Sequence, residues 1–287
     1  MTCKYPCIHY LQAHPSELHR LWWCSTGPLA FLPFHAAGIY SPDIQSPGSC
    51  VSDFVVSSYT PTVGTLLEKV KTSSSKRPST SKILLVSQPY TPGLPPIPGT
   101  TRELDALCEK FGTGNEFLRV EGVDATIDRV KQEMETSGWV HLACHASQDT
   151  DSPLKSGFFL HDGRLELSEI MKRNIPQCEL AYLSACQTSA GDEKLSEEAV
   201  HLAAGMLAAG YQGVVATMWS IKDKHAPDVA GDFYEYLLKQ GKDEGNAQLD
   251  SSRGAYALHH AMQCLRKDIG DSEGGLLTWL PYVHFGF

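Results

Sequence analysis

Two apolar stretches set the expected architecture of this chain: Trp139-Val-His-Leu-Ala-Cys-His145-Ala146 and Leu180-Ala-Tyr-Leu-Ser-Ala-Cys186-Gln-Thr188. Each has the length of a buried parallel strand and ends in a reactive side chain followed by small or polar residues. The ligand crevice of an open α/β sheet lies at the carboxyl ends of its strands. If the two strands are neighbours, His145 and Cys186 share one crevice, which is the minimum apparatus for a cysteine nucleophile with a histidine base.

Strands and helices alternate along the rest of the chain, which predicts a mostly parallel sheet covered by helices on both faces. Strands are expected shortly after residue 51, at 83–87, 117–120 and 213–219, as a hairpin at 157–165, and at 277–286. Helices are expected from about residue 61 and at 101–111, 125–135, 167–173, 196–212, 227–239 and 254–267.

The domain organisation follows from composition along the chain. An irregular segment, 1–20, is expected to precede one domain that spans residues 21–287. Within it, the stretch Leu21–Gly38 is strongly apolar and is expected in the core. Residues 72–81 are rich in serine and predict a polar linker.

Bulk composition excludes several classes of function. The chain has 287 residues, a formal net charge of −9 and no basic stripe, so nucleic acid is not an expected partner. No apolar run reaches the roughly 18 residues of a membrane span, and the first residues lack the apolar core of a signal peptide. The nine cysteines are an odd number scattered through a large chain, which favours a reduced, cytoplasmic protein.

The chemistry of His145 and Cys186 suits acyl transfer. Only the thiolate attacks, and a free thiol with a pKa of about 8.5 needs a nearby base or positive charge. Histidine, with an unperturbed pKa of about 6.5, can accept and return a proton near neutrality. The backbone amides of Ala146 and Cys186 are candidates for an oxyanion hole. The alternative is that both residues are buried and merely end their strands.

A metal site is not expected. His141 and His145 are four residues apart, and in a strand such residues lie about 13 Å apart, too far to bind one ion. A zinc site formed by Cys144, His145, Cys178 and Cys186 has irregular spacing. No cofactor is required by any motif in the chain.

A second polar group follows the expected strand at 213–219. Asp223 lies where that strand ends and is a candidate for a specificity pocket at the same edge of the sheet. The pattern alone favours a solvated loop or a helix-capping aspartate, because Ala226-Pro227 opens the next helix. The acidic run 191–198 follows Cys186, and there Ser196 is expected to cap a helix.

Several ordered blocks resemble the CHAT family, the caspase- and separase-related cysteine peptidases of clan CD, in its fungal form. The blocks are Trp22–Gly38, Ser58–Thr62, Val140–Ala146, Leu183–Thr188 and Ala203–Asp223, and the resemblance covers about residues 21–287.

The resemblance implies a caspase-type three-layer α/β/α sandwich with His145 as general base and Cys186 as nucleophile. In this clan the histidine is thought to polarise the substrate or to protonate the leaving amine. In related separases an aspartate in a similar segment contacts a basic P1 side chain, and Asp223 matches it. Trp219 and Ser184, which lie in the matching blocks, are expected to contact substrate as well.

Three features depart from the family pattern. Ala146 replaces the glycine of the caspase and separase His-Gly pair, and Lys222 precedes Asp223 where the family often has a second aspartate. No tetratricopeptide repeats are present, although family members often carry them upstream as regulatory modules.

The main hypothesis is therefore a cysteine endopeptidase acting on a protein or peptide substrate, with a regulatory tetratricopeptide or signalling domain as a further partner. The alternatives are a catalytically inactive interaction module and a thiol hydrolase of small esters or amides.

Overall fold

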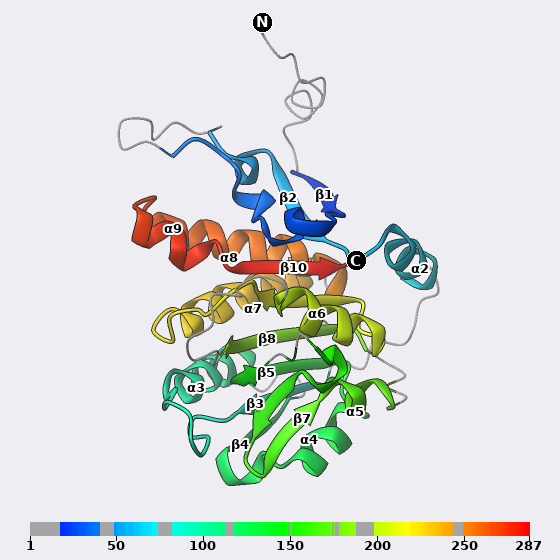
Figure 1. Ribbon diagram of the computed structural model, residues 1–287. Coiled ribbons are helices and arrows are strands. Elements are labelled where there is room, and N and C mark those ends of the chain that lie inside the picture. Colours follow the sequence, from blue (N-terminus) through cyan, green and yellow to red (C-terminus); the bar gives the residue numbers. More distant parts are fainter. Residues whose placement is uncertain are drawn as a thin grey trace, which may run out of the picture.

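The computed structural model describes residues 18–40, 49–73, 82–112, 117–147, 149, 151–173, 175, 178–187, 198–243 and 249–287. It contains one sheet with helices on both of its faces (Figure 1). The main path through the sheet is β1-β2-β10-β9-β8-β5-β3-β4, and β6 and β7 extend from β5. The strands are β1 His19–Trp23, β2 Val55–Tyr59, β3 Ile83–Ser87, β4 Phe117–Glu121, β5 Trp139–Ser147, β6 Gly157–Leu160, β7 Gly163–Glu166, β8 Leu180–Gln187, β9 Gly213–Thr217 and β10 Tyr282–Gly286.

The centre of the sheet is parallel, as the sequence predicts. β5 pairs in parallel with β3 on one side and with β8 on the other, and β8 pairs in parallel with β9. Antiparallel pairs occur where β10 meets β9 and where β6 meets β5. The expected α/β sandwich with a mostly parallel sheet is therefore confirmed.

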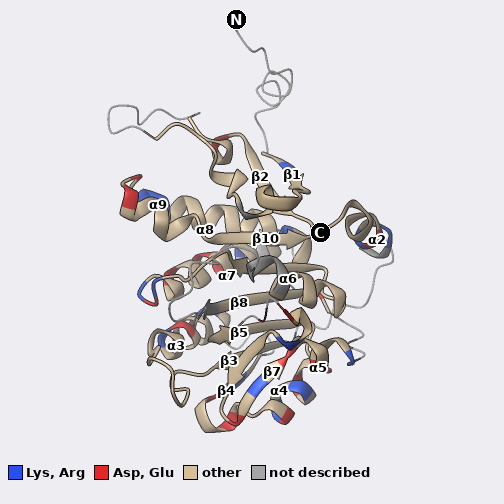
Figure 2. Cartoon of the chain, in the orientation of Figure 1, with Lys and Arg blue, Asp and Glu red and all other residues tan. Residues whose placement is uncertain are grey.

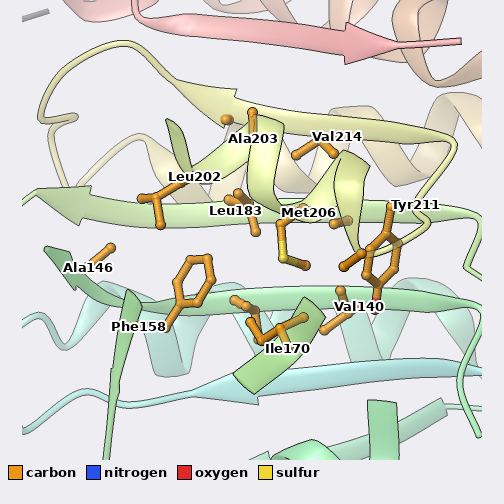
Figure 3. Close-up of a cluster of buried hydrophobic side chains, with 14 of the residues drawn as sticks. Val140, Ala146, Phe158, Ile170, Leu183, Leu202, Ala203, Met206, Tyr211 and Val214 are labelled. Atoms are coloured by element: carbon orange, nitrogen blue, oxygen red, sulfur yellow. The ribbon is translucent and has the colours of Figure 1, made fainter. Parts of the chain in front are cut away.

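Each face of the sheet carries its own hydrophobic core, because successive side chains of a strand point to opposite faces. One core packs against α3 Gly99–Phe111, α7 Ala226–Asp243, α8 Gly254–Ile269 and α9 Glu273–Trp279. The other packs against α4 Ile127–Met134, α5 Leu167–Met171 and α6 Glu198–Ala208. Figure 3 shows the second core, where Val140 of β5 and Leu183 of β8 lie near Met206 of α6. These buried contacts hold the two strands that carry His145 and Cys186.

Charged residues lie mainly on the outer helices, with both signs interspersed, whereas β3, β5 and β8 contain none (Figure 2). Strands covered on both faces are expected to be apolar throughout. Of the helices described, none has both the length and the apolar character needed to cross a membrane.

The prediction that Leu21–Gly38 belongs to the core is wrong for most of that stretch. It forms edge strand β1 and short 3-10 turns, and Leu21, Leu29 and Leu32 are 40%, 53% and 47% exposed. Among the residues of this stretch whose burial is described, only His35 and Ala36 are buried. The reason is position: β1 pairs with β2 alone and has only one neighbour in the sheet path.

Other boundaries also differ from the prediction. Helix α3 begins at Gly99 rather than Thr101, because Pro98, which lacks an N–H, stands at its start. The stretch expected as one strand at 277–286 is divided: α9 ends at Trp279 and β10 begins at Tyr282. Helix α2 Val63–Ser73 covers the first residues of the expected linker, and residues 74–81 lie outside the described part, as do residues 1–17.

Buried His35 gives this region a pH dependence. Its Nε2–H donates to the Leu280 carbonyl (3.0 Å), so Nδ1 accepts from the Tyr59 hydroxyl (2.8 Å). Burial lowers the pKa of His35 to about 4. Between about pH 6.5 and 4 the unfolded chain binds a proton here that the folded chain does not, so acidification lowers the free energy of unfolding, by about 3 kcal/mol over that window.

We expect His35→Gln to reduce the slope of unfolding free energy against pH in this window, as measured by urea titration. The exposed His161 offers a matched control, and His161→Gln should keep the wild-type slope. An unchanged slope for His35→Gln would contradict the assignment.

Candidate active site

The two strands singled out in the sequence are neighbours in the sheet. β5 and β8 pair along eight residues, from Trp139 opposite Leu180 to Ala146 opposite Gln187. In this register the Cα atoms of His145 and Cys186 are partners. Both residues therefore lie near the carboxyl ends of adjacent parallel strands, which is where ligands bind in open α/β sheets.

The imidazole of His145 is held by a backbone carbonyl. Its side chain is buried, with an exposed fraction of 2%, and Nε2 lies 2.8 Å from the Pro95 carbonyl oxygen. A carbonyl can only accept, so Nε2 carries the proton in the neutral ring. Nδ1 is then the basic nitrogen, and it has no hydrogen-bond partner among the described residues. The Pro95 carbonyl thus holds the imidazole in one tautomer, and the unprotonated nitrogen Nδ1 is buried.

Ala146 lies inside the sheet rather than at its rim. It is fully buried and is in register with Gln187 of β8 on one side and with Phe158 of β6 on the other. The amide of a strand residue points toward a neighbouring strand. An oxyanion hole formed by the amides of Ala146 and Cys186 therefore stays a prediction.

Asp223 lies in the segment between β9 and α7 and is bonded to another helix. Its Oδ2 accepts a hydrogen bond from the backbone N–H of Gly99 at 2.9 Å. Gly99 is the first residue of α3, so Asp223 caps that helix from a distant part of the sequence. Asp223 is thus a helix-capping aspartate, but the helix that it caps is α3 rather than α7, which follows it in the sequence. Trp219, in the same segment, is partly buried against the core of the α6 face.

Ser184 belongs to a buried polar cluster. Its hydroxyl donates to Oε2 of Glu103 at 2.9 Å, and Oε1 of Glu103 lies 2.9 Å from Nε2 of His141. The contact between His141 Nε2 and Glu103 Oε1 is close but does not have the geometry of a well-formed hydrogen bond. The side chains of Glu103 and His141 are 1% and 0% exposed. Glu103, from α3, therefore connects both of the strands that carry the candidate dyad.

Two tyrosines complete this cluster. Tyr182 stacks on the His141 ring at 4.7 Å between ring centroids, and the Tyr234 hydroxyl lies 3.4 Å from His141 Nδ1. Burial, with a smaller contribution from the Glu103 charge, raises the pKa of Tyr234, so its hydroxyl stays protonated. The His141 ring is therefore surrounded by contacts with other side chains of the protein. Within the described ranges, no group of three or more His, Cys, Asp or Glu side chains is placed to hold a metal ion.

Sequence reasoning missed Pro95, Gly99 and Glu103. The signal for the first two was the Pro-rich stretch 89–99, which follows a buried strand and so lies at the edge of the sheet that carries the ligand crevice. The signal for Glu103 was a carboxylate in the first turn of a helix that packs on the sheet. The acidic run 191–198 and Ser196 lie outside the described residues, apart from Glu198 at the start of α6.

Comparison with known proteins gives one family and several similar folds. The description of the matching family is "CHAT domain", and its match covers residues 4–286. No curated protein matches the chain.

Solved structures share the fold at low sequence identity. Gingipain R, an Arg-specific cysteine proteinase, superposes with a TM-score of 0.59 at 11% identity, covering 97% of this chain and 66% of its own. The complex of the pro- and mature domains of the Porphyromonas gingivalis enzyme gives 0.54 at 10% identity, covering 97% of this chain and 67% of that one. Separase bound to securin, from Saccharomyces cerevisiae, gives 0.55 at 12% identity, covering 84% of this chain and 15% of that chain. This chain thus spans just under two thirds of gingipain R and a small part of separase.

Proposed function

Because the chain belongs to the CHAT domain family, we propose that it is a cysteine endopeptidase in which Cys186 is the nucleophile and His145 the general acid and base. The pairing of these two residues across adjacent strands carries the proposal. The fixed tautomer of His145 and a fold shared with the cysteine proteinase gingipain R support it.

The reaction would proceed through an acyl-enzyme. The Cys186 thiol gives its proton to Nδ1 of His145, and the resulting thiolate attacks the carbonyl carbon of the scissile peptide bond. The new S–C bond forms as the carbonyl oxygen takes up negative charge. The amides of Ala146 and Cys186 are proposed to stabilise that oxyanion. Protonated Nδ1 of His145 gives its proton to the leaving amine as the C–N bond breaks. Water then hydrolyses the thioester, which releases the carboxylic acid and restores the thiol.

Specificity is proposed to come from the segment after β9. Asp223 would contact an Arg or Lys side chain at P1, and Trp219 would line the same pocket. The description of gingipain R as Arg-specific supports this assignment. Because the Ser184 hydroxyl is already bonded to Glu103, its proposed role is confined to shaping the floor of the site.

Covalent labelling tests the proposal. We expect an irreversible peptidyl acyloxymethyl ketone with P1 Arg to label Cys186 faster than the matched probe with P1 Leu, as located by peptide mass spectrometry. Cys186→Ala should abolish labelling, while Cys24→Ala, at an exposed thiol, should leave it unchanged.

The other outcomes separate the rival functions. A preference for P1 Leu would keep the peptidase and remove Asp223 from the P1 pocket. No labelling of folded protein by either probe would overturn the endopeptidase in favour of an inactive CHAT-fold interaction module.

A further inference from the structure

One short segment connects the catalytic imidazole to the start of α3. Its sequence is Leu94-Pro95-Pro96-Ile97-Pro98-Gly99, and its Pro95 carbonyl accepts the Nε2–H of His145. Proline fixes φ, so a segment in which three of the four residues 95–98 are proline has little freedom to bend. Ile97 anchors the middle of the segment: its side chain is buried and its N–H donates to the Pro89 carbonyl at 3.0 Å. Because the segment is stiff and Ile97 acts as its pivot, displacement at one end is transmitted to the other.

Asp223 holds the far end of the segment. The bond from Gly99 N–H to Asp223 Oδ2 is charge-assisted and lies at the positive end of the α3 dipole, and both features strengthen it. A Cβ atom on residue 99 would collide with the Asp223 carboxylate. Glycine at this position is what lets the carboxylate approach the helix so closely.

We propose that Asp223 is a positioning residue for His145, acting through Gly99 and Pro95, in addition to its contact with P1. The inference rests on the proposed function, since it assigns His145 a catalytic role. Without the Asp223 carboxylate, the first amide of α3 loses its acceptor and the Pro95 carbonyl loses a fixed place. The proposed P1 contact at Asp223 and the catalytic base are then connected through residues 95–99, with one hydrogen bond at each end.

Nitrogen NMR of the histidine rings tests the positioning without requiring activity. In ¹⁵N-histidine-labelled protein, with the His145 signals assigned by their loss in His145→Gln, we expect the Nε2–H tautomer in the wild type. Asp223→Ala should convert it to a mixture of tautomers. Asp223→Asn should keep it, because the amide oxygen still accepts from Gly99. Asp228→Ala, which removes an exposed carboxylate from the first turn of α7, is the matched control and should change nothing.

Kinetics with P1 Arg and P1 Leu peptides give the second readout. A misplacement of a catalytic group by about 1 Å can lower the rate about 10²-fold. We therefore expect Asp223→Ala, which frees the segment that holds His145, to lower kcat by about this factor for both peptides. Asp223→Asn should recover kcat for the P1 Leu peptide while remaining poor with P1 Arg. Gly99→Ala, which displaces the carboxylate without removing its charge, should reproduce the effects of Asp223→Ala and replaces it if that variant does not fold.

The outcomes distinguish the two proposals. A wild-type tautomer in both Asp223→Ala and Gly99→Ala, with an unchanged kcat for P1 Leu, would overturn the positioning role. If the wild type cleaves neither peptide but the tautomer responds to Asp223→Ala and not to Asp223→Asn, the positioning stands and the peptidase assignment falls.

Discussion

Replacing His145 with alanine is expected to lower kcat/KM for peptide hydrolysis by about 10³-fold or more. General acid–base catalysis alone contributes about 10² to 10⁴, and the substitution removes both the proton acceptor for the thiol and the donor for the leaving amine. The only ring nitrogen left free by the Pro95 carbonyl is Nδ1, so the imidazole has one defined proton-transfer site to lose. Initial rates with a P1 Arg peptide at neutral pH provide the measurement.

Two controls separate a loss of catalysis in His145→Ala from other effects of the substitution. His161→Ala removes an exposed imidazole in the β6–β7 turn and should keep the wild-type rate. Because His145 is buried, each variant is also compared by its melting temperature, so that a loss of folding is not mistaken for a loss of catalysis. A folded His145→Ala protein that retains a tenth of the wild-type rate would contradict the assignment of His145 as the base.

The second large effect concerns stability rather than rate. Glu103→Ala is expected to lower the free energy of unfolding by about 1–3 kcal/mol, because it leaves the buried Ser184 hydroxyl without its acceptor and removes the carboxylate that lies beside buried His141. Glu103→Gln should cost less, since its amide oxygen still accepts from Ser184. Urea unfolding followed by tryptophan fluorescence measures both values.

A carboxylate on the exposed side of the same helix gives the control. Glu109→Ala should change the free energy of unfolding by less than about 0.5 kcal/mol, as is usual for surface substitutions. If Glu103→Ala is no more destabilising than Glu109→Ala, the buried cluster does not hold α3 against β5 and β8.

The central strands could be predicted because each is apolar throughout and is bounded by polar or turn residues. The prediction for Ile83–Ser87 matches β3 residue for residue, and the two reactive strands match their predicted extents to within one residue. The prediction for Leu21–Gly38 failed because an apolar sequence favours burial but does not show whether another helix or strand packs over it. Whether a strand lies at the centre or the edge is a long-range property of the sheet order.

Some residues of the candidate site could likewise be predicted from the sequence and others could not. His145 and Cys186 could be predicted because reactive side chains at strand ends are visible in sequence. The Pro95 carbonyl could not, because any residue offers the same backbone oxygen and only the path of the loop brings this one to the imidazole. The bond from Gly99 to Asp223 joins residues that are 124 positions apart in the sequence, so the sequence near one residue does not indicate the other.

The place of β10 in the sheet bears on how the chain can be synthesised. β2 ends at Tyr59 and β10 begins at Tyr282, yet β10 lies between β2 and β9. During synthesis, β1 and β2 leave the ribosome long before the strand that connects them to the rest of the sheet. Until β10 arrives, β9 is an open edge able to pair with another chain. Closing contacts so distant in sequence is slow. The edge of β9 therefore stays unpaired on that side until residues 282–286 have been synthesised.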